Sequence, residues 1–144
     1  MNDAGAGRYD AAVTFRAVLT TEFGRRRSAN ARYSLRSFAR DLAADHSTLS
    51  QILRGKRRLT GRNVRAFGRR LRLPATQIAE HCALENESAV LAALDRANVK
   101  ADSRWLASVV GIPLDEVNVT LQRLLRKRIV SMTALARWVR AQEA

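Results

Sequence analysis

The sequence predicts an almost entirely helical fold. Along most of the chain, apolar residues recur three and four positions apart, which is the spacing of one face of an α-helix. Short segments rich in Gly, Pro or polar residues separate these periodic stretches. Residues 129–132 are the exception, because they are short and β-prone. We therefore expect an all-α fold in which residues 129–132 form a short strand and residues 133–144 form either the rest of a small β-hairpin or a terminal helix.

Five helices are expected in the first half of the chain. The first three cover about residues 9–24, 35–42 and 45–54, and residues 25–32 form a basic connector between the first two. The fourth follows Thr60 and has Val64, Phe67, Gly68 and Leu71 on its inner side, and the fifth runs through Ile78 and Cys82 to about Leu84. Ser34, Asp45 and Thr60 each precede one of these helices and can cap it through a side-chain oxygen. Gly55 can take the left-handed conformation that ends the third helix, and Pro74 separates the fourth helix from the fifth.

The second half is expected to begin at Glu85, Asn86 and Glu87, where the composition changes and one helix gives way to the next. This boundary divides the chain into domains of residues 1–84 and 85–144. The elements expected in the second domain are a helix around residues 90–94, a short strand or connector at 99–101, a helix capped by Asp102 or Ser103 and ended by Gly111, and a helix opened by Pro113 that buries Val117, Leu121, Leu124 and Leu125.

Positive charge is concentrated in the first half. The formal net charge is +13, and residues 1–84 hold 17 Lys and Arg against 6 Asp and Glu, whereas residues 85–144 hold 9 against 7. Because 47% of the residues are hydrophobic, this charge belongs to a folded protein and indicates a polyanionic partner. The cations form three groups, each of which is also compatible with a solvated surface: Arg25 to Arg27, Lys56 to Arg58, and Arg62, Arg65, Arg69, Arg70 and Arg72.

Residues 34–59 have the layout of a DNA-reading helix-turn-helix, with two short helices, a tight turn and a basic loop. On the second helix of this pair, polar side chains share an arc of about 140° opposite the apolar side. They are His46, Ser47, Ser50, Gln51 and Arg54. Gln can pair with adenine and Arg with guanine, while Ser and His suit base edges or phosphates. The alternative is an ordinary solvated helix surface.

These residues resemble the XRE-type, lambda-repressor-like helix-turn-helix of bacterial and phage regulators. The resemblance covers about residues 10–84 and rests on SLR at 34–36, FA at 38–39, STLS at 47–50, IL at 52–53 and GKR at 55–57. It implies a five-helix domain whose third helix enters the major groove, with base contacts from His46, Ser47, Ser50, Gln51 and Arg54 and phosphate contacts from Arg36, Lys56, Arg57 and Arg58. Ala43 departs from the pattern, because the family usually has Gly in the turn.

The second half resembles a winged-helix domain through SRWLASVVGIPLDEV at 103–117 and LQRLLRKRIV at 121–130. The resemblance implies that residues 129–132 and 137–139 are the two strands of the wing. The helix that would read DNA there begins with Asp115 and Glu116, and two carboxylates at its leading end are unfavourable beside phosphates. We therefore interpret residues 85–144 as a self-association or partner-binding module. Trp105 and Trp138 are expected to be core residues.

Enzymatic chemistry finds no support in the sequence. HExxH, CxxC, GxSxG and GxxxxGK[ST] motifs are absent, and His46 and His81 are isolated. We expect neither an enzyme nor a metal or cofactor. Cys82, four residues after Ile78 on a helical pattern, is expected to be a buried thiol.

The function expected from the sequence is a sequence-specific regulator that binds double-stranded DNA as a homodimer, because one reading helix contacts only a few base pairs. Residues 1–13 lack the apolar core of a signal peptide and the apolar run at 89–94 is too short to span a membrane, so a cytoplasmic, nucleoid-associated protein is expected. The alternative is an antitoxin-like or adaptor protein whose residues 85–144 bind a partner protein. RNA binding is less favoured, because no aromatic platform accompanies the arginines.

Overall fold

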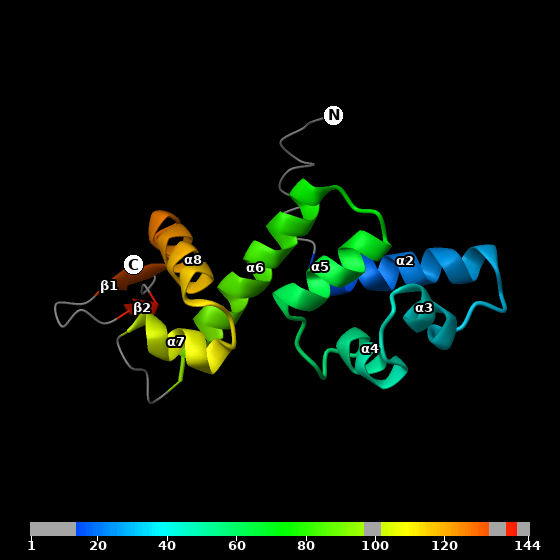
Figure 1. Ribbon diagram of the computed structural model, residues 1–144, viewed down its shortest axis with the longest axis horizontal. Coiled ribbons are helices and arrows are strands. Elements are labelled where there is room, and N and C mark those ends of the chain that lie inside the picture. The colour runs from blue at the N-terminus through cyan, green and yellow to red at the C-terminus, as the bar shows by residue number, and fades with distance from the viewer. Residues whose placement is uncertain (1–13, 97–101, 133–137, 141–144) are drawn as a thin grey trace. The chain divides into compact units, whose positions relative to one another are not determined.

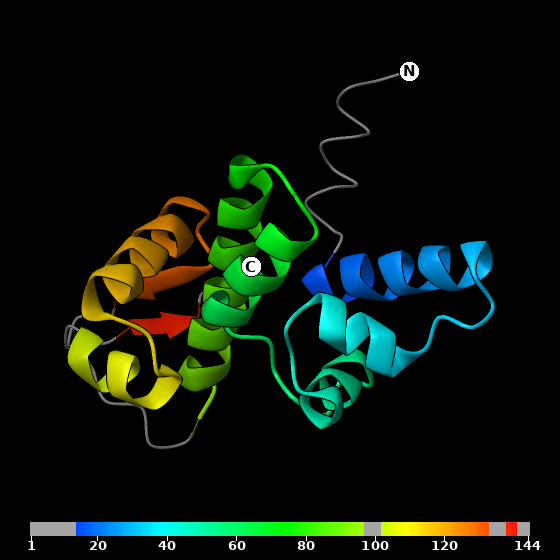
Figure 2. The same cartoon turned by 45° about the vertical axis from the view of Figure 1, so that its right-hand side comes forward.

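Helices make up most of the structure, a computed structural model that describes residues 14–96, 102–132 and 138–140. These residues form seven helices and one small sheet (Figures 1 and 2). The helices are α2 (Phe15–Ala29), α3 (Leu35–Asp41), α4 (His46–Leu53), α5 (Gly61–Arg70), α6 (Ala75–Leu94), α7 (Ser103–Val110) and α8 (Leu114–Arg126), and the strands are β1 (Val130–Met132) and β2 (Trp138–Arg140). The mostly helical class predicted from the sequence is confirmed.

Contacts between residues divide the chain into two compact units, Met1–His81 and Cys82–Ala144. The first unit contains α2 to α5 and the first part of α6. Its core consists of side chains that are almost inaccessible to solvent and come from α2 to α5 and the loops beside them: Phe15, Leu19, Phe38, Ala39, Leu42, Leu49, Ile52, Leu59, Val64 and Phe67. Helix α4 packs against both α2 and α3, so its orientation is set by this core.

Helix α2 extends beyond its predicted C-terminal end. The side chain of Thr14 accepts a hydrogen bond from the backbone N–H of Ala17, so the helix begins at Phe15, and the predicted start near Tyr9 lies outside the described residues. The predicted end at Gly24 is wrong, because the helix continues to Ala29. Glycine weakens a helix by only about 1 kcal/mol, and the arginines that follow it are good helix formers. Thus Arg25 to Arg27 lie in the last turns of α2 and do not form a connector.

An arginine at the end of α2 ties this helix to α3. Nη1 of Arg26 donates hydrogen bonds to Oη of Tyr33 at 3.1 Å and to Oδ2 of Asp41 at 3.0 Å. The guanidinium group also lies over the rings of Tyr33 and Phe38. The Tyr33 hydroxyl donates a hydrogen bond to Oδ2 of Asp41. Desolvation and this hydrogen bond raise the pKa of the Tyr33 hydroxyl, so Tyr33 remains a neutral donor. This cluster connects the last turn of α2 to both ends of α3.

Helix α6 crosses the position where the sequence predicts a break. A helix ending near Leu84 and a separate helix around residues 90–94 were expected, but α6 is continuous from Ala75 to Leu94. Asn86 and Glu87 are buried within the second unit, where Asn86 Nδ2 donates to Oε2 of Glu116 at 3.1 Å and Glu87 accepts hydrogen bonds from Arg123 and Lys127. The polar residues that suggested a break therefore have tertiary partners, and nothing in this segment prevents a helix. Cys82 is buried, as predicted.

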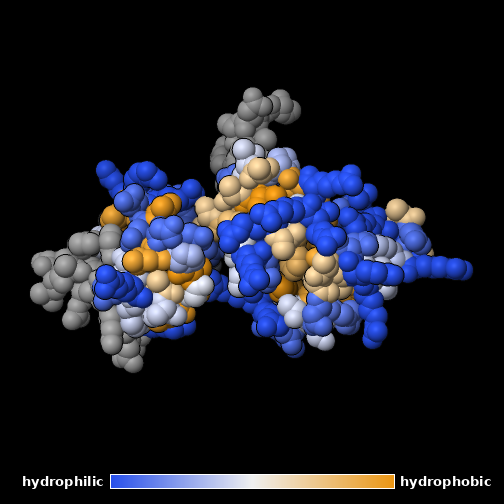
Figure 3. Space-filling model, in the orientation of Figure 1, coloured by the Kyte–Doolittle hydropathy of each residue, from blue (hydrophilic) through white to orange (hydrophobic). Residues whose placement is uncertain are grey.

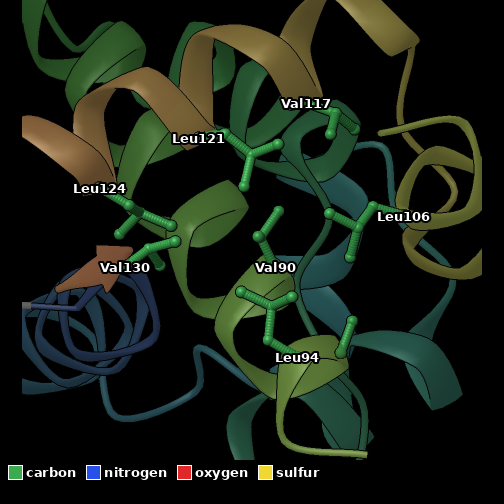
Figure 4. Close-up of a cluster of buried hydrophobic side chains, with 8 residues drawn as sticks. Val90, Leu94, Leu106, Val117, Leu121, Leu124 and Val130 are labelled. Carbon is green, nitrogen blue, oxygen red and sulfur yellow. The ribbon is translucent and has the colours of Figure 1, made fainter. Parts of the chain in front are cut away.

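Helices α6, α7 and α8 and strand β1 enclose the core of the second unit (Figure 4). The largest contributions come from Val90, Leu94, Leu106, Val117, Leu121, Leu124 and Val130, which point toward one another. Trp105 is half-buried and packs against this cluster. Asp102 caps α7, and Gly111 ends it with a φ of 78°, in agreement with the prediction.

The predicted burial of Leu125 on α8 is wrong. Leu125 is 38% exposed, and Thr120 occupies the buried arc in its place. At 100° per residue, Leu125 lies about 40° further from the centre of the buried arc than Leu121, whereas Thr120 lies within the arc. The Thr120 hydroxyl donates to the backbone oxygen of Glu116 at 2.7 Å, which allows its burial.

The two strands pair in antiparallel fashion, with Val130 opposite Arg140 and Met132 opposite Trp138. The predicted hairpin is thus present, with its second strand one residue later than expected, and the alternative of a helix through residues 133–144 is wrong for residues 138–140. The predicted strand or connector at 99–101 and the predicted turn at 133–136 lie outside the described residues, as does the side chain of Trp138.

Candidate nucleic-acid interface

Helix α4 is capped at both ends as its sequence predicts. Oδ2 of Asp45 accepts a hydrogen bond from the backbone N–H of Thr48 at 2.9 Å and another from the Thr48 hydroxyl. These hydrogen bonds hold the pKa of the Asp45 carboxyl below its usual value, so the N-cap stays ionised. At the other end, Gly55 has a φ of 74°, and the N–H of Lys56 donates to the oxygen of Gln51 at 2.8 Å.

The polar face of α4 lies opposite its buried side. We use this name for His46, Ser47, Ser50, Gln51 and Arg54. Leu49 and Ile52 are inaccessible to solvent, whereas Ser47, Gln51 and Arg54 are exposed and His46 and Ser50 are half-buried. All five side chains predicted to read bases therefore lie on one side of one helix and reach the surface, wholly or in part.

The turn between α3 and α4 has a residue in the left-handed conformation at Ala43, with a φ of 54°. The N–H of Ala43 donates to the oxygen of Arg40, and the N–H of Ala44 donates to the oxygen of Ala39 at 2.8 Å. A side chain in this conformation costs about 1–2 kcal/mol compared with the ordinary helical region. Ala43 thus adopts the conformation for which glycine is better suited, and the turn is tight.

A basic loop, Lys56 to Arg58, follows α4 after Arg54 and Gly55, in the segment that joins α4 to α5 (Figure 1). All three side chains are exposed. Nη1 of Arg57 donates to Oγ1 of Thr48 at 3.0 Å, so this guanidinium group folds back along α4 toward its first turn. The loop is therefore anchored to α4 by its backbone, through Gln51, and by one side chain.

Two other arginines, Arg16 and Arg36, differ in whether they contact α4. Nε of Arg16, on α2, donates to the backbone oxygen of Ile52 at 3.1 Å and so satisfies a carbonyl at the end of α4. The sequence contains no signal for this contact, because the two residues are 36 positions apart. Arg36, predicted to bind phosphate, is exposed on the first turn of α3 and makes no hydrogen bond or ion pair with any described residue.

The exposed side chains on and around α4 are mostly cationic: Arg36, Arg54, Lys56, Arg57 and Arg58. Nη2 of Arg54 donates to Oγ of Ser50 at 3.0 Å, a contact between two members of the polar face that leaves most of the guanidinium donors unused. In the space-filling view, hydrophilic side chains cover much of the visible face over α2 to α5, with apolar surface between them (Figure 3). Such a surface is suited to a polyanion with exposed hydrogen-bonding edges.

Comparison with protein-family models, curated proteins and solved structures gave no match to this chain. Within the described ranges, no cluster of three or more His, Cys, Asp or Glu side chains could hold a metal ion. No helix among these residues combines the length and the apolar character needed to cross a membrane.

Proposed function

We propose that the chain is a sequence-specific regulator that binds double-stranded DNA and inserts the polar face of α4 into the major groove. The observation that carries this proposal is the arrangement of α4 itself. Its apolar side is locked into the core, while Ser47, Gln51 and Arg54 are presented to solvent by a helix that is capped at both ends. A rigid helix with an amide and a guanidinium on its outer face can make bidentate hydrogen bonds to adenine and guanine.

The surroundings of α4 support the same function. The basic loop leaves the C-terminal end of α4, and Arg36 lies on the preceding helix of the pair, so cations flank the polar face in sequence on both sides. Cations beside a reading helix position it by binding phosphates. The tight turn at Ala43 and the order of the helices favour an XRE-type, lambda-repressor-like fold for this unit. In this proposal the protein acts without enzymatic chemistry.

The second unit supplies self-association in this proposal, with a winged-helix-like fold formed by α7, α8 and the hairpin. The supporting observation is that three large apolar side chains of α8 are exposed, Leu114, Val119 and Leu125 at 39%, 58% and 38%. Exposed apolar side chains of this size on one helix favour a protein partner. A second copy of the chain would supply the second reading helix that a specific site requires. Sedimentation of the full chain should show a dimer that Val119→Lys weakens.

The same surface of α8 keeps one other function open, that of an antitoxin-like or adaptor protein whose second unit binds a different protein. Selection of bound duplexes from a random pool tests the main proposal directly. A palindromic consensus would establish both specific reading and two-fold symmetry. Recovery of unrelated sequences from the pool would refute specific DNA recognition and favour the adaptor function.

A further inference from the structure

A pocket of about 540 Å³ lies between the turn that joins α3 to α4 and the side of α5. Its accessible apolar lining comes from Ala43, Ala44 and Ala66, whereas Leu42 and Phe67 belong to the core and are only 2% and 4% exposed. Its volume falls within the range typical of sites for small molecules. All of its lining residues belong to the first unit, and none is on the polar face of α4 or in the basic loop.

Three arginines of α5 border this pocket. The side chains of Arg62, Arg69 and Arg70 are exposed, and none of these side chains makes a hydrogen bond or an ion pair with any residue that the structure describes. The one carboxylate in the lining is that of Asp45, which is engaged in capping α4. Three cations and one anion leave an excess of two positive charges around an apolar recess. These guanidinium groups have unused donors that could bind an anion bidentately.

We propose that this pocket binds a small organic anion with an apolar body, about the size of an aromatic ring, and a terminal phosphate or carboxylate group. The body would replace water on Ala43, Ala44 and Ala66, and the anionic group would pair with Arg62, Arg69 and Arg70. An apolar ligand without charge would leave the guanidinium groups unpaired. Inorganic phosphate would leave the apolar lining hydrated. The site therefore selects for a molecule that has both parts.

The pocket is connected to the candidate DNA interface through Thr48. This residue lines the pocket, and its hydroxyl accepts the hydrogen bond from Arg57 of the basic loop. An anion held here adds negative charge close to the start of α4 and competes for the Arg57 guanidinium. Bound ligand should therefore weaken the binding of DNA phosphates. This regulatory consequence rests on the proposed function, whereas the binding of the anion does not.

The binding step is tested by titrating the ¹⁵N-labelled full chain with phenyl phosphate and following the backbone amides of Ala43, Ala44, Ala66 and Phe67. The result expected is a saturable shift of these amides. The dissociation constant should rise at least about tenfold for Arg62→Gln/Arg70→Gln and should change less than about twofold for the matched control Arg27→Gln/Arg32→Gln. Inorganic phosphate and benzyl alcohol should each bind at least about tenfold more weakly than phenyl phosphate.

Titration with phenylacetate distinguishes the two kinds of anionic group, since tighter binding than phenyl phosphate would assign the site to carboxylates. The proposal is overturned if the pocket amides do not shift, or if both double variants respond like the unchanged protein, because the shifts would then reflect general screening. Unchanged amide spectra elsewhere in the variants establish that the substitutions preserve the fold.

The regulatory step is tested by measuring affinity for the selected duplex with and without saturating phenyl phosphate. A decrease of at least about threefold is expected for the unchanged chain and none for Arg62→Gln/Arg70→Gln. If this variant instead bound every duplex more weakly and its salt dependence became shallower, the arginines would bind phosphates and the regulatory role would be refuted. If no duplex were selected at all, the proposed function would fail, while the titration with phenyl phosphate would still decide on the pocket.

Discussion

A methyl group at position 68 would lie 2.7 Å from Cγ1 of Ile78 and 3.0 Å from its Cδ1 atom. Gly68 is buried on α5 and Ile78 lies in the first turns of α6. The two helices therefore pack together in the first unit at a point where only a hydrogen atom fits. A larger residue would require Ile78 to move.

Gly68→Ala should lower the free energy of unfolding by about 1–3 kcal/mol, because the cost of overpacking exceeds the gain in helix propensity. The measurement is urea denaturation followed by far-UV circular dichroism. Gly24→Ala is the matched control, since no atom lies within 4 Å of its added methyl group, and it should stabilise α2 by about 0.5–1 kcal/mol. Adding Ile78→Ala should make Gly68→Ala harmless; if it does not, the close contact is not the cause.

Ala43→Gly should stabilise the protein, because glycine adopts the left-handed conformation of this turn without strain. The expected gain in the free energy of unfolding is about 0.5–1 kcal/mol. The same substitution at Ala79, which is exposed within α6, should lower stability by a similar amount. Equal decreases at both positions would show that Ala43 is not strained.

Gln51→Ala and Arg54→Ala should each reduce affinity for the selected duplex by about 1–3 kcal/mol and relax the preference at one base pair. Non-specific binding should hardly change, because neither side chain is needed to bind phosphates. Competition gel shifts with single-base variants of the site provide the measurement. Gln77→Ala, at an exposed position on α6, is the control. Full retention of base preference in both α4 variants would mean that another surface reads the sequence.

Replacement of Lys56, Arg57 and Arg58 by Gln should weaken binding to all duplexes alike. The slope of log affinity against log salt concentration should become shallower by up to about 0.9 for each phosphate that the variant no longer neutralises. Arg25→Gln/Arg27→Gln, at the end of α2, should leave the slope unchanged. A slope that is the same with and without the three loop cations would show that they are merely solvated.

Glu87 is only 6% exposed, and Nζ of Lys127 lies 2.9 Å and 3.0 Å from its two carboxylate oxygens, with Nε of Arg123 at 3.2 Å from one of them. Removing both cations, by Arg123→Met/Lys127→Met, leaves a buried charge without these partners and should cost about 3 kcal/mol. Glu87→Gln should cost only about 1 kcal/mol, because its former partners are partly exposed and regain water. Thermal unfolding measures this asymmetry, and equal costs would contradict it.

Much of the helical architecture could be predicted because the signals are local. Ser34, Asp45, Thr60 and Asp102 cap the helices that follow them, and Gly55 and Gly111 take left-handed conformations at helix ends. A cap requires only a side-chain oxygen and a backbone N–H three residues away, so it can be recognised without knowledge of the rest of the fold. The polar face of α4 is predictable for the same reason, because it follows from the spacing of residues within one helix.

Residues whose partners are distant in sequence were predicted wrongly. Asn86 and Glu87 suggested a break because they are polar, but their partners Glu116, Arg123 and Lys127 lie 30 to 40 positions away. Arg26 likewise was expected in a connector, whereas it lies in the last turn of α2 and contacts Tyr33 and Asp41. Propensity and polarity describe a residue in isolation, whereas its burial depends on which groups the fold brings to it.

Local sequence alone sets the helical class, most helix boundaries, the polar face of α4 and the concentration of charge in the first half, because periodicity, capping and composition are properties of neighbouring residues. Tertiary packing was needed to show that α6 is continuous, that Thr48 accepts a hydrogen bond from Arg57, and that Arg62, Arg69 and Arg70 border an apolar pocket beside the α3–α4 turn. These features depend on how segments far apart in the chain lie against one another, and a pattern within one segment carries no information about which other segment will pack against it.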